Sequence, residues 1–170
     1  MSCVESVSSV ESHLDLQPRN ARVLSLQPDE KLAVFNGILA DEEWRNKLQL
    51  HLQKTHEAES VMFLQQAREL LRSLLAQPAG CNLDEATGQQ VHSVVLGYVL
   101  PGASHAVCLS SPTLRDIMSA YDLFAHSADH AALEQALSRC VAEVALDLRF
   151  SGGYMTFVQN HKTELIGELL

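Results

Sequence analysis

The sequence predicts an all-α protein with the architecture of an irregular multi-helix bundle. Apolar residues recur at three- and four-residue steps through most of the 170-residue chain. No segment alternates polar and apolar residues convincingly, as a half-buried β-strand would, and no internal repeat has the spacing of a solenoid. Because the predicted helices are unequal and joined by short, varied loops, we expect an irregular bundle and not a symmetric coiled coil.

The length and the changing composition of the chain predict one domain with an N-terminal extension. A chain of 170 residues is long enough for one well-buried core and short for two. Residues 1–28 mix Ser, Val and Glu, are interrupted by Pro18 and Pro28, and lack sustained periodicity. We therefore expect a mobile lead-in over residues 1–28 and a helical domain over residues 29–168.

Three helices are predicted in the first half of the domain. The first presents an apolar face made of Leu32, Val34, Phe35 and Ile38. Asp41 can cap a second helix that runs to Leu52, and Thr55 can cap a third. The third has the clearest apolar stripe, formed by Val61, Phe63, Leu64, Ala67, Leu70, Leu71 and Leu74.

The second half contains four further predicted helices. Asp84 can open a helix that stops at Leu100-Pro101-Gly102, and Ser111-Pro112 is a start signal for the next. Asp129 is expected to begin the longest helix, with Leu133, Leu137, Cys140, Val144 and Leu148 on its stripe. Gly152-Gly153 is predicted to separate that helix from one final helix. The aromatic side chains at positions 63, 98, 154 and 157 are expected in the core.

Charge and cysteine usage restrict the classes of partner and compartment. The net charge of −9 disfavours binding to nucleic acid or to anionic lipid. The four cysteines form no Cys-x-x-Cys pair, which fits a reducing compartment, and no apolar run is long enough to span a bilayer. We expect a cytoplasmic protein, either free or peripheral to the inner membrane face. Cys3 is a weak candidate for acylation, because Ser2 stands where myristoylation needs glycine.

Motifs for catalysis and cofactor binding are missing from the sequence. There is no Gly-x-Ser-x-Gly, no Gly-x-Gly-x-x-Gly and no Walker sequence, so we predict neither an enzyme nor a bound cofactor. His126 and His130 have the i, i+4 spacing of metal ligands. Because Asp129 is the expected helix cap, His126 would lie in the preceding loop, and we predict no metal site.

Ordered motifs over residues 31–160 resemble the regulator-of-G-protein-signalling (RGS) homology domain. The family pattern Phe-x-x-Phe-Leu, polar loop, Glu-Asn-aliphatic-x-Phe-Trp is similar to Leu48, His51 and Leu52 followed by Glu59-Ser60-Val61-Met62-Phe63-Leu64. Downstream, residues 91–99, 107–110 and 113–115 resemble the family's next helix, loop and helix. Residues 154–160, Tyr-Met-Thr-Phe-Val-Gln-Asn, resemble its closing aromatic motif.

The resemblance implies a protein-binding surface without catalytic residues of its own. Members of the family accelerate GTP hydrolysis by holding the switch regions of a G-protein α subunit in their transition-state shape. In this chain the implied partner-binding residues are Glu57, Glu59, Ser60, Ser119, Gly152 and Thr156. Ser60 stands where the family has asparagine, a second family asparagine falls near Ser119, and two charged positions fall on Gly152 and Thr156.

These departures imply an RGS-like interaction module with weak or absent GTPase-activating activity. Its expected partner is a protein, with a G-protein α subunit as the first candidate. Two alternatives belong to other classes. One is a helical adaptor unrelated to G proteins, because amphipathic helices of this composition are common. The other is a metal protein built on His126 and His130, which elemental analysis would test.

Overall fold

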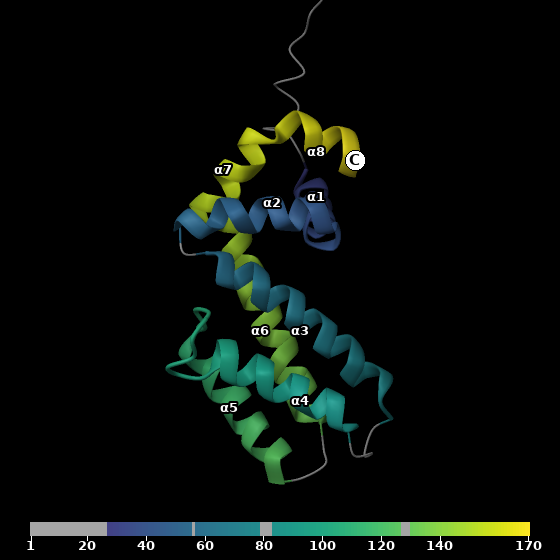
Figure 1. Cartoon of the computed structure of the whole chain (residues 1–170), viewed down its shortest axis with the longest axis vertical. Helices are drawn as coiled ribbons and strands as arrows, with labels where there is room; N and C mark the ends of the chain where they lie inside the picture. Colours follow the sequence, from purple (N-terminus) through teal and green to yellow (C-terminus); the bar gives the residue numbers. More distant parts are fainter. Residues whose placement is uncertain (1–26, 56, 79–82, 127–129) are drawn as a thin grey trace, which may run out of the picture.

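The computed structural model describes residues 27–55, 57–78, 83–126 and 130–170. All regular structure in this part of the chain is helical, which confirms the predicted all-α class (Figure 1). The predicted lead-in lies outside the described residues, except for Gln27 and Pro28, which cap and begin the first helix. Over the same residues, no helix combines the length and the apolar character needed to cross a membrane.

The helices form two groups that lie one after the other along the longest axis of the molecule (Figure 1). The described elements are α1 (Pro28–Ala40), α2 (Glu42–Leu52), the short helix η2 (Gln53–Thr55), α3 (Ala58–Ala76), α4 (Glu85–Val94), the π-helical turn η3 (Val95–Val99), α5 (Ser111–His126), α6 (Ala131–Phe150), α7 (Gly152–Asn160) and α8 (Lys162–Leu169). Helices α3, α4, α5 and α6 pack as a bundle, and α1, α2, α7 and α8 form the other end (Figure 1). The two groups are joined through α2 to α3 and through α6 to α7.

The predicted apolar stripes form the core. Phe35, Phe63 and Phe157 are fully buried, and Phe63 and Phe157 belong to different helix groups, so burial is continuous along the molecule. Tyr98 and Tyr154 are also buried, as predicted. The other fully buried large side chains are Ile38, Leu48, Leu52, Leu64, Leu70, Leu74, Ile117, Leu133 and Leu137. Leu32 was expected on the buried face of α1, but it is 42% exposed, and the buried residues of α1 lie later in the helix, at Val34, Phe35, Ile38 and Leu39.

Two of the predicted helix caps are confirmed and one is wrong. Asp41 accepts a hydrogen bond from the Trp44 backbone amide at 2.9 Å, and Asp84 accepts one from the Thr87 amide at 2.7 Å. Thr55 does not cap α3. It lies in η2 and donates its hydroxyl to the Leu52 carbonyl at 3.1 Å, because the chain makes an extra 3₁₀ turn before α3 begins.

The predicted single C-terminal helix is two helices, which meet at His161. The His161 backbone departs from helical geometry with φ −107° and ψ 17°, and its ring packs against Trp44 and Phe157. The resulting turn directs α8 onto α1 and α2. There the indole N–H of Trp44 donates to Glu168 at 2.8 Å. An uninterrupted helix would not bring Glu168 back to Trp44.

Candidate functional site

The link between α2 and α3 meets the start of α7 through one polar contact. Glu57 occupies the position before α3, and Ser151 occupies the position before α7. The Ser151 hydroxyl donates to Oε2 of Glu57 at 2.8 Å and accepts from the Tyr154 amide at 3.2 Å. Ser151 therefore caps α7 and ties it to the α2–α3 link. We call Glu57, Glu59, Ser60, Ser151 and Gly152 the polar corner.

Gly153 permits the close approach of α7 to this link. A Cβ atom at position 153 would lie 2.3 Å from Oε2 of Glu57, 2.6 Å from Cδ2 of Leu52 and 3.0 Å from Oγ1 of Thr55. At Gly152 a Cβ atom would meet nothing within 4 Å. The sequence predicted that both glycines break the chain between helices. Instead, both belong to the first turn of α7, and only Gly153 is needed for packing.

Glu59 and Ser60 lie in the first turn of α3. The Ser60 amide donates to the Glu57 carbonyl at 3.2 Å. Glu59 is partly buried, and its Oε2 has no hydrogen-bond partner among the described residues although it is shielded from water. The positive end of the α3 dipole stabilises a negative charge here.

Tyr98 extends the polar corner toward the loop between η3 and α5. Its ring packs against Phe63 with centroids 6.0 Å apart and against His105 at 5.8 Å. Gln66 donates to the Tyr98 hydroxyl at 2.9 Å. Burial raises the pKa of Tyr98, the Gln66 hydrogen bond opposes this, and the charge of Glu59 raises it further, so the phenol stays protonated at neutral pH.

The loop after η3 is fixed at its far end by Glu143 of α6. The carboxylate accepts from the backbone amide of Ser110, from the Ser110 hydroxyl at 3.0 Å and from the Thr113 hydroxyl at 2.5 Å. Figure 1 shows this loop on the same side of the molecule as the α2–α3 link. Burial raises the pKa of Glu143, but these hydrogen bonds outweigh burial and lower it overall.

The remaining two predicted site residues differ in their placement. Thr156 is exposed on α7, one turn after Gly152, and donates to the Gly152 carbonyl at 2.8 Å. Ser119 is exposed in the middle of α5. The structure therefore brings together Glu57, Glu59, Ser60 and Gly152, with Thr156 beside them, and no described contact connects Ser119 to this group.

The two histidines with metal-ligand spacing do not form a chelating pair on one helix. His126 ends α5 and its Nδ1 lies 2.7 Å from the Asp122 carbonyl, while His130 is buried immediately before α6. Nδ1 of His130 has no hydrogen-bond partner among the described residues. The expected cap, Asp129, lies outside the described residues. Where the structure is described, no group of three or more His, Cys, Asp and Glu side chains is arranged to hold a metal ion.

Ser151 and Gly153 are the residues of this site that sequence reasoning missed. Ser151 carried a usable signal, because a serine directly after a long helical stripe and three residues before an aromatic is a common N-cap arrangement. The signal for Gly153 was weaker, since Gly-Gly indicates a break as often as a close contact.

No family model matches the chain, and no curated protein or solved structure matches it either. The resemblance to the RGS family therefore rests on the sequence motifs alone and stays a prediction.

Proposed function

We propose that the chain is an RGS-like protein-interaction module that binds a G-protein α subunit through the polar corner. The observation that carries the proposal is the Ser151–Glu57 hydrogen bond of 2.8 Å, which joins two segments that the family resemblance independently assigns to partner binding. Such a site acts by rigid placement of polar groups and needs no nucleophile of its own. The α subunit would supply the arginine and the water-orienting glutamine for hydrolysis.

The chemistry of the polar corner favours binding with weak or absent GTPase activation. Ser60 offers one short hydroxyl where the family has a carboxamide with two N–H donors and a carbonyl acceptor. Glu59 keeps the acid of the motif and lies in the first turn of α3. The site therefore keeps the acidic residue of the family motif, as Glu59, but has Ser60 in place of the asparagine. Fewer contacts would then stabilise the transition state of GTP hydrolysis.

Single-turnover GTP hydrolysis by a panel of α subunits tests this proposal, with binding measured in parallel on the GDP–aluminium fluoride form. We expect binding with little acceleration by the wild-type protein. Ser60→Asn restores the family amide and should raise the hydrolysis rate at saturating module, by about tenfold if one hydrogen bond in the transition state is regained. Glu57→Ala should weaken binding because it removes the partner of Ser151.

A matched control is Gln135→Ala, which changes an exposed residue near the start of α6, at the opposite end of that helix from Ser151. It should leave binding and hydrolysis unchanged. Absence of binding to every α subunit, by both the wild type and Ser60→Asn, would contradict the proposal and favour a helical adaptor with another partner.

A further inference from the structure

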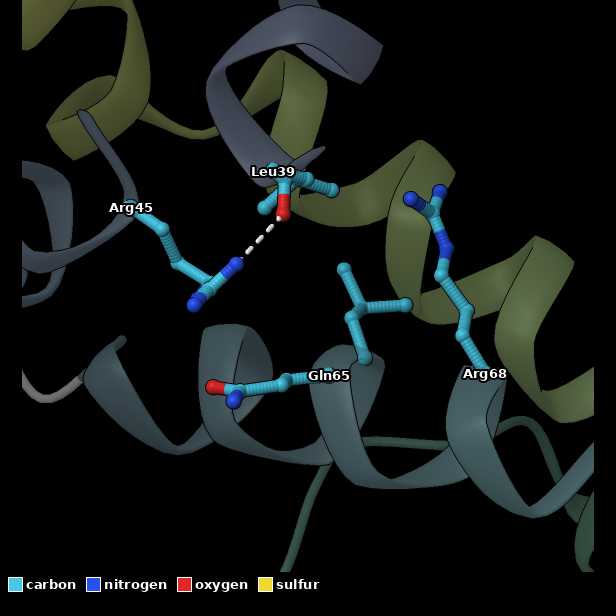
Figure 2. A pocket seen from close by; sticks show the side chains of 5 residues that line it. Leu39, Arg45, Gln65 and Arg68 are labelled. Carbon is cyan, nitrogen blue, oxygen red and sulfur yellow. Dashed lines mark hydrogen bonds between the residues drawn. The ribbon is translucent and has the colours of Figure 1, made fainter. Parts of the chain in front are cut away.

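The hollow between the α1–α2 turn and α3 has no room for a ligand. Its volume is about 10 Å³, which corresponds to at most about one water molecule. Figure 2 shows the Arg45 side chain reaching across it toward Leu39, to whose carbonyl Nη1 donates at 3.1 Å. The exposed surface of the molecule offers a stronger candidate for a further binding site.

Three large apolar side chains lie exposed where α6 passes into α7. Phe150 is 70% exposed, Met155 58% and Leu146 50%. Leu146 and Phe150 are one helical turn apart on α6 and therefore share a face. Phe150 and Met155 occupy the positions directly before and four residues after the Ser151 cap, whose side chains commonly adjoin across a helix start. We call Leu146, Phe150 and Met155 the apolar strip.

The apolar strip borders the polar corner. Ser151 and Gly152 lie between Phe150 and Met155 along the chain, and the Ser151 hydroxyl donates to Glu57 at 2.8 Å. Single exposed apolar residues are ordinary on protein surfaces, but adjoining ones rimmed by polar groups mark interaction sites. An apolar centre beside hydrogen-bonding polar groups is the arrangement of a protein–protein interface.

Phe150 has the features of an interface anchor. Of the large apolar side chains that the structure describes, it is the most exposed, and the guanidinium of Arg149 lies 5.0 Å from its ring centroid. This cation–π contact restricts the ring before a partner arrives, so that less conformational entropy is lost on binding. Aromatic residues, methionine and arginine are enriched in interfaces, and a few such residues carry most of the affinity.

The charges of this surface determine which kind of partner fits it. Across the α2–α3 link and the α6–α7 junction, the carboxylates of Glu57, Glu59 and Asp147 outnumber the cations of Lys54 and Arg149. The whole chain carries a net charge of −9, so two copies repel each other. A symmetric dimer would also place each patch against its own like charges. A different protein, with basic side chains around an apolar surface, is complementary in charge.

We propose that Phe150 and Met155, with Leu146 beside them, anchor the polar corner to a partner protein whose contact surface is apolar and bordered by lysine or arginine. This inference rests on the proposed function, because it adds the apolar part to the interface of the polar corner. Burial of the strip supplies affinity, while the acidic groups around it select a basic partner over a second copy of this chain.

Binding of the full chain to the GDP–aluminium fluoride forms of the α-subunit panel, followed by biolayer interferometry, tests the anchor. Phe150→Ala should weaken binding about ten- to hundredfold and Met155→Ala about three- to tenfold, chiefly through faster dissociation. Both side chains are exposed, so the variants should fold as the wild type does, which circular dichroism checks.

Leu75→Ala is the matched control. It truncates an apolar side chain that is 66% exposed at the far end of α3 from Glu57, and it should alter affinity by less than about twofold. Wild-type affinity in Phe150→Ala would overturn the anchor and leave the proposed function of the polar corner standing. Equal weakening by Leu75→Ala would also overturn the anchor.

If no α subunit binds, two synthetic peptides test the same surface. Both carry one apolar core sequence, flanked by lysines in one peptide and by glutamates in the other. The wild-type chain should bind the lysine-flanked peptide about tenfold more tightly, with NMR shift changes of the ¹⁵N-labelled protein centred on residues 146, 150 and 155. Phe150→Ala should reduce that affinity about tenfold. This result would support the anchor while the proposed function fails.

Three outcomes of the peptide titrations would overturn the anchor. They are no binding of the lysine-flanked peptide, equal binding of the two peptides, and wild-type affinity in Phe150→Ala. Sedimentation velocity of the full chain tests the alternative occupant. A monomer supports the proposal, whereas a dimer that Phe150→Ala abolishes would assign the strip to a second copy of this chain and overturn it.

Discussion

The hydroxyl of Ser151 donates to the carboxylate of Glu57 across 94 residues of sequence, at a distance of 2.8 Å. The contact joins the two segments of the polar corner, because Glu57 precedes the bundle helix α3 and Ser151 precedes α7. Both side chains are partly buried. The geometry of the polar corner should therefore depend on this pair.

A double-mutant cycle measures that dependence. Ser151→Ala and Glu57→Ala should each lower the free energy of unfolding, and their coupling should be about 0.5–1.5 kcal/mol, the range of a partly buried hydrogen bond. Urea unfolding followed by circular dichroism gives the four values. Fully additive effects would show that the hydrogen bond contributes nothing to stability.

Alanine substitution at the two glycines of α7 should change the stability of the protein in opposite directions. Gly153→Ala should destabilise the protein by roughly 1–3 kcal/mol, because a Cβ would lie 2.3 Å from Glu57 Oε2 and 2.6 Å from Leu52 Cδ2. Gly152→Ala introduces a methyl group into open space and should stabilise α7 by about 0.5–1 kcal/mol. Thermal unfolding of the two variants beside the wild type checks both signs. Equal effects would show that α7 does not approach the α2–α3 link closely.

Removal of the Glu168 carboxylate should weaken the packing of α8 against α2. Glu168→Ala leaves the indole N–H of the buried Trp44 without its 2.8 Å partner, at a cost of about 1 kcal/mol. Hydrogen exchange of the α8 amides should accelerate. Glu164→Ala is the control, since it removes the 3.5 Å contact to His161 and a charge interaction with Lys47, both near the surface, and should change little. Equal acceleration by both variants would refute a specific role for the Trp44 contact.

Glu143 should make stability depend on pH in the acidic range. Its pKa in the folded state is lowered from the model-peptide value of 4.5, so its contribution is fully present above about pH 4.5 and is lost as the pH falls through the folded-state pKa. Glu143→Gln should reduce the slope of unfolding free energy against pH below that value. An unchanged slope would assign acid sensitivity to other carboxylates.

The two described cysteines should differ in reactivity. Cys140 is buried, and burial, with the charge of Glu143, raises its pKa to about 12. Cys108 is exposed. Alkylation by iodoacetamide near pH 8, followed by peptide mass spectrometry, should modify Cys108 while Cys140 stays protected until the protein unfolds. Modification of Cys140 under native conditions at a comparable rate would show that α6 opens locally.

Local signals in the sequence were sufficient to predict most of the helices. Asp41 and Asp84 were identifiable as caps because a cap acts within three residues of its own position. The stripe from Val61 to Leu74 was identifiable because helical periodicity is a property of the segment itself. The predictions at Thr55 and His161 were wrong because the local sequence there is compatible with more than one backbone conformation. Contacts with Leu52, Trp44 and Phe157 select the conformation that the structure shows.

For the functional site, the sequence by itself determined which segments were candidates, while the tertiary structure decided which of them meet. Glu57 and Gly152 belong to segments that converge, whereas Ser119 is exposed in mid-helix and has no described contact with them. The physical reason is the same in each case. Capping and periodicity act over a few residues, but which distant side chains become neighbours depends on how whole helices pack.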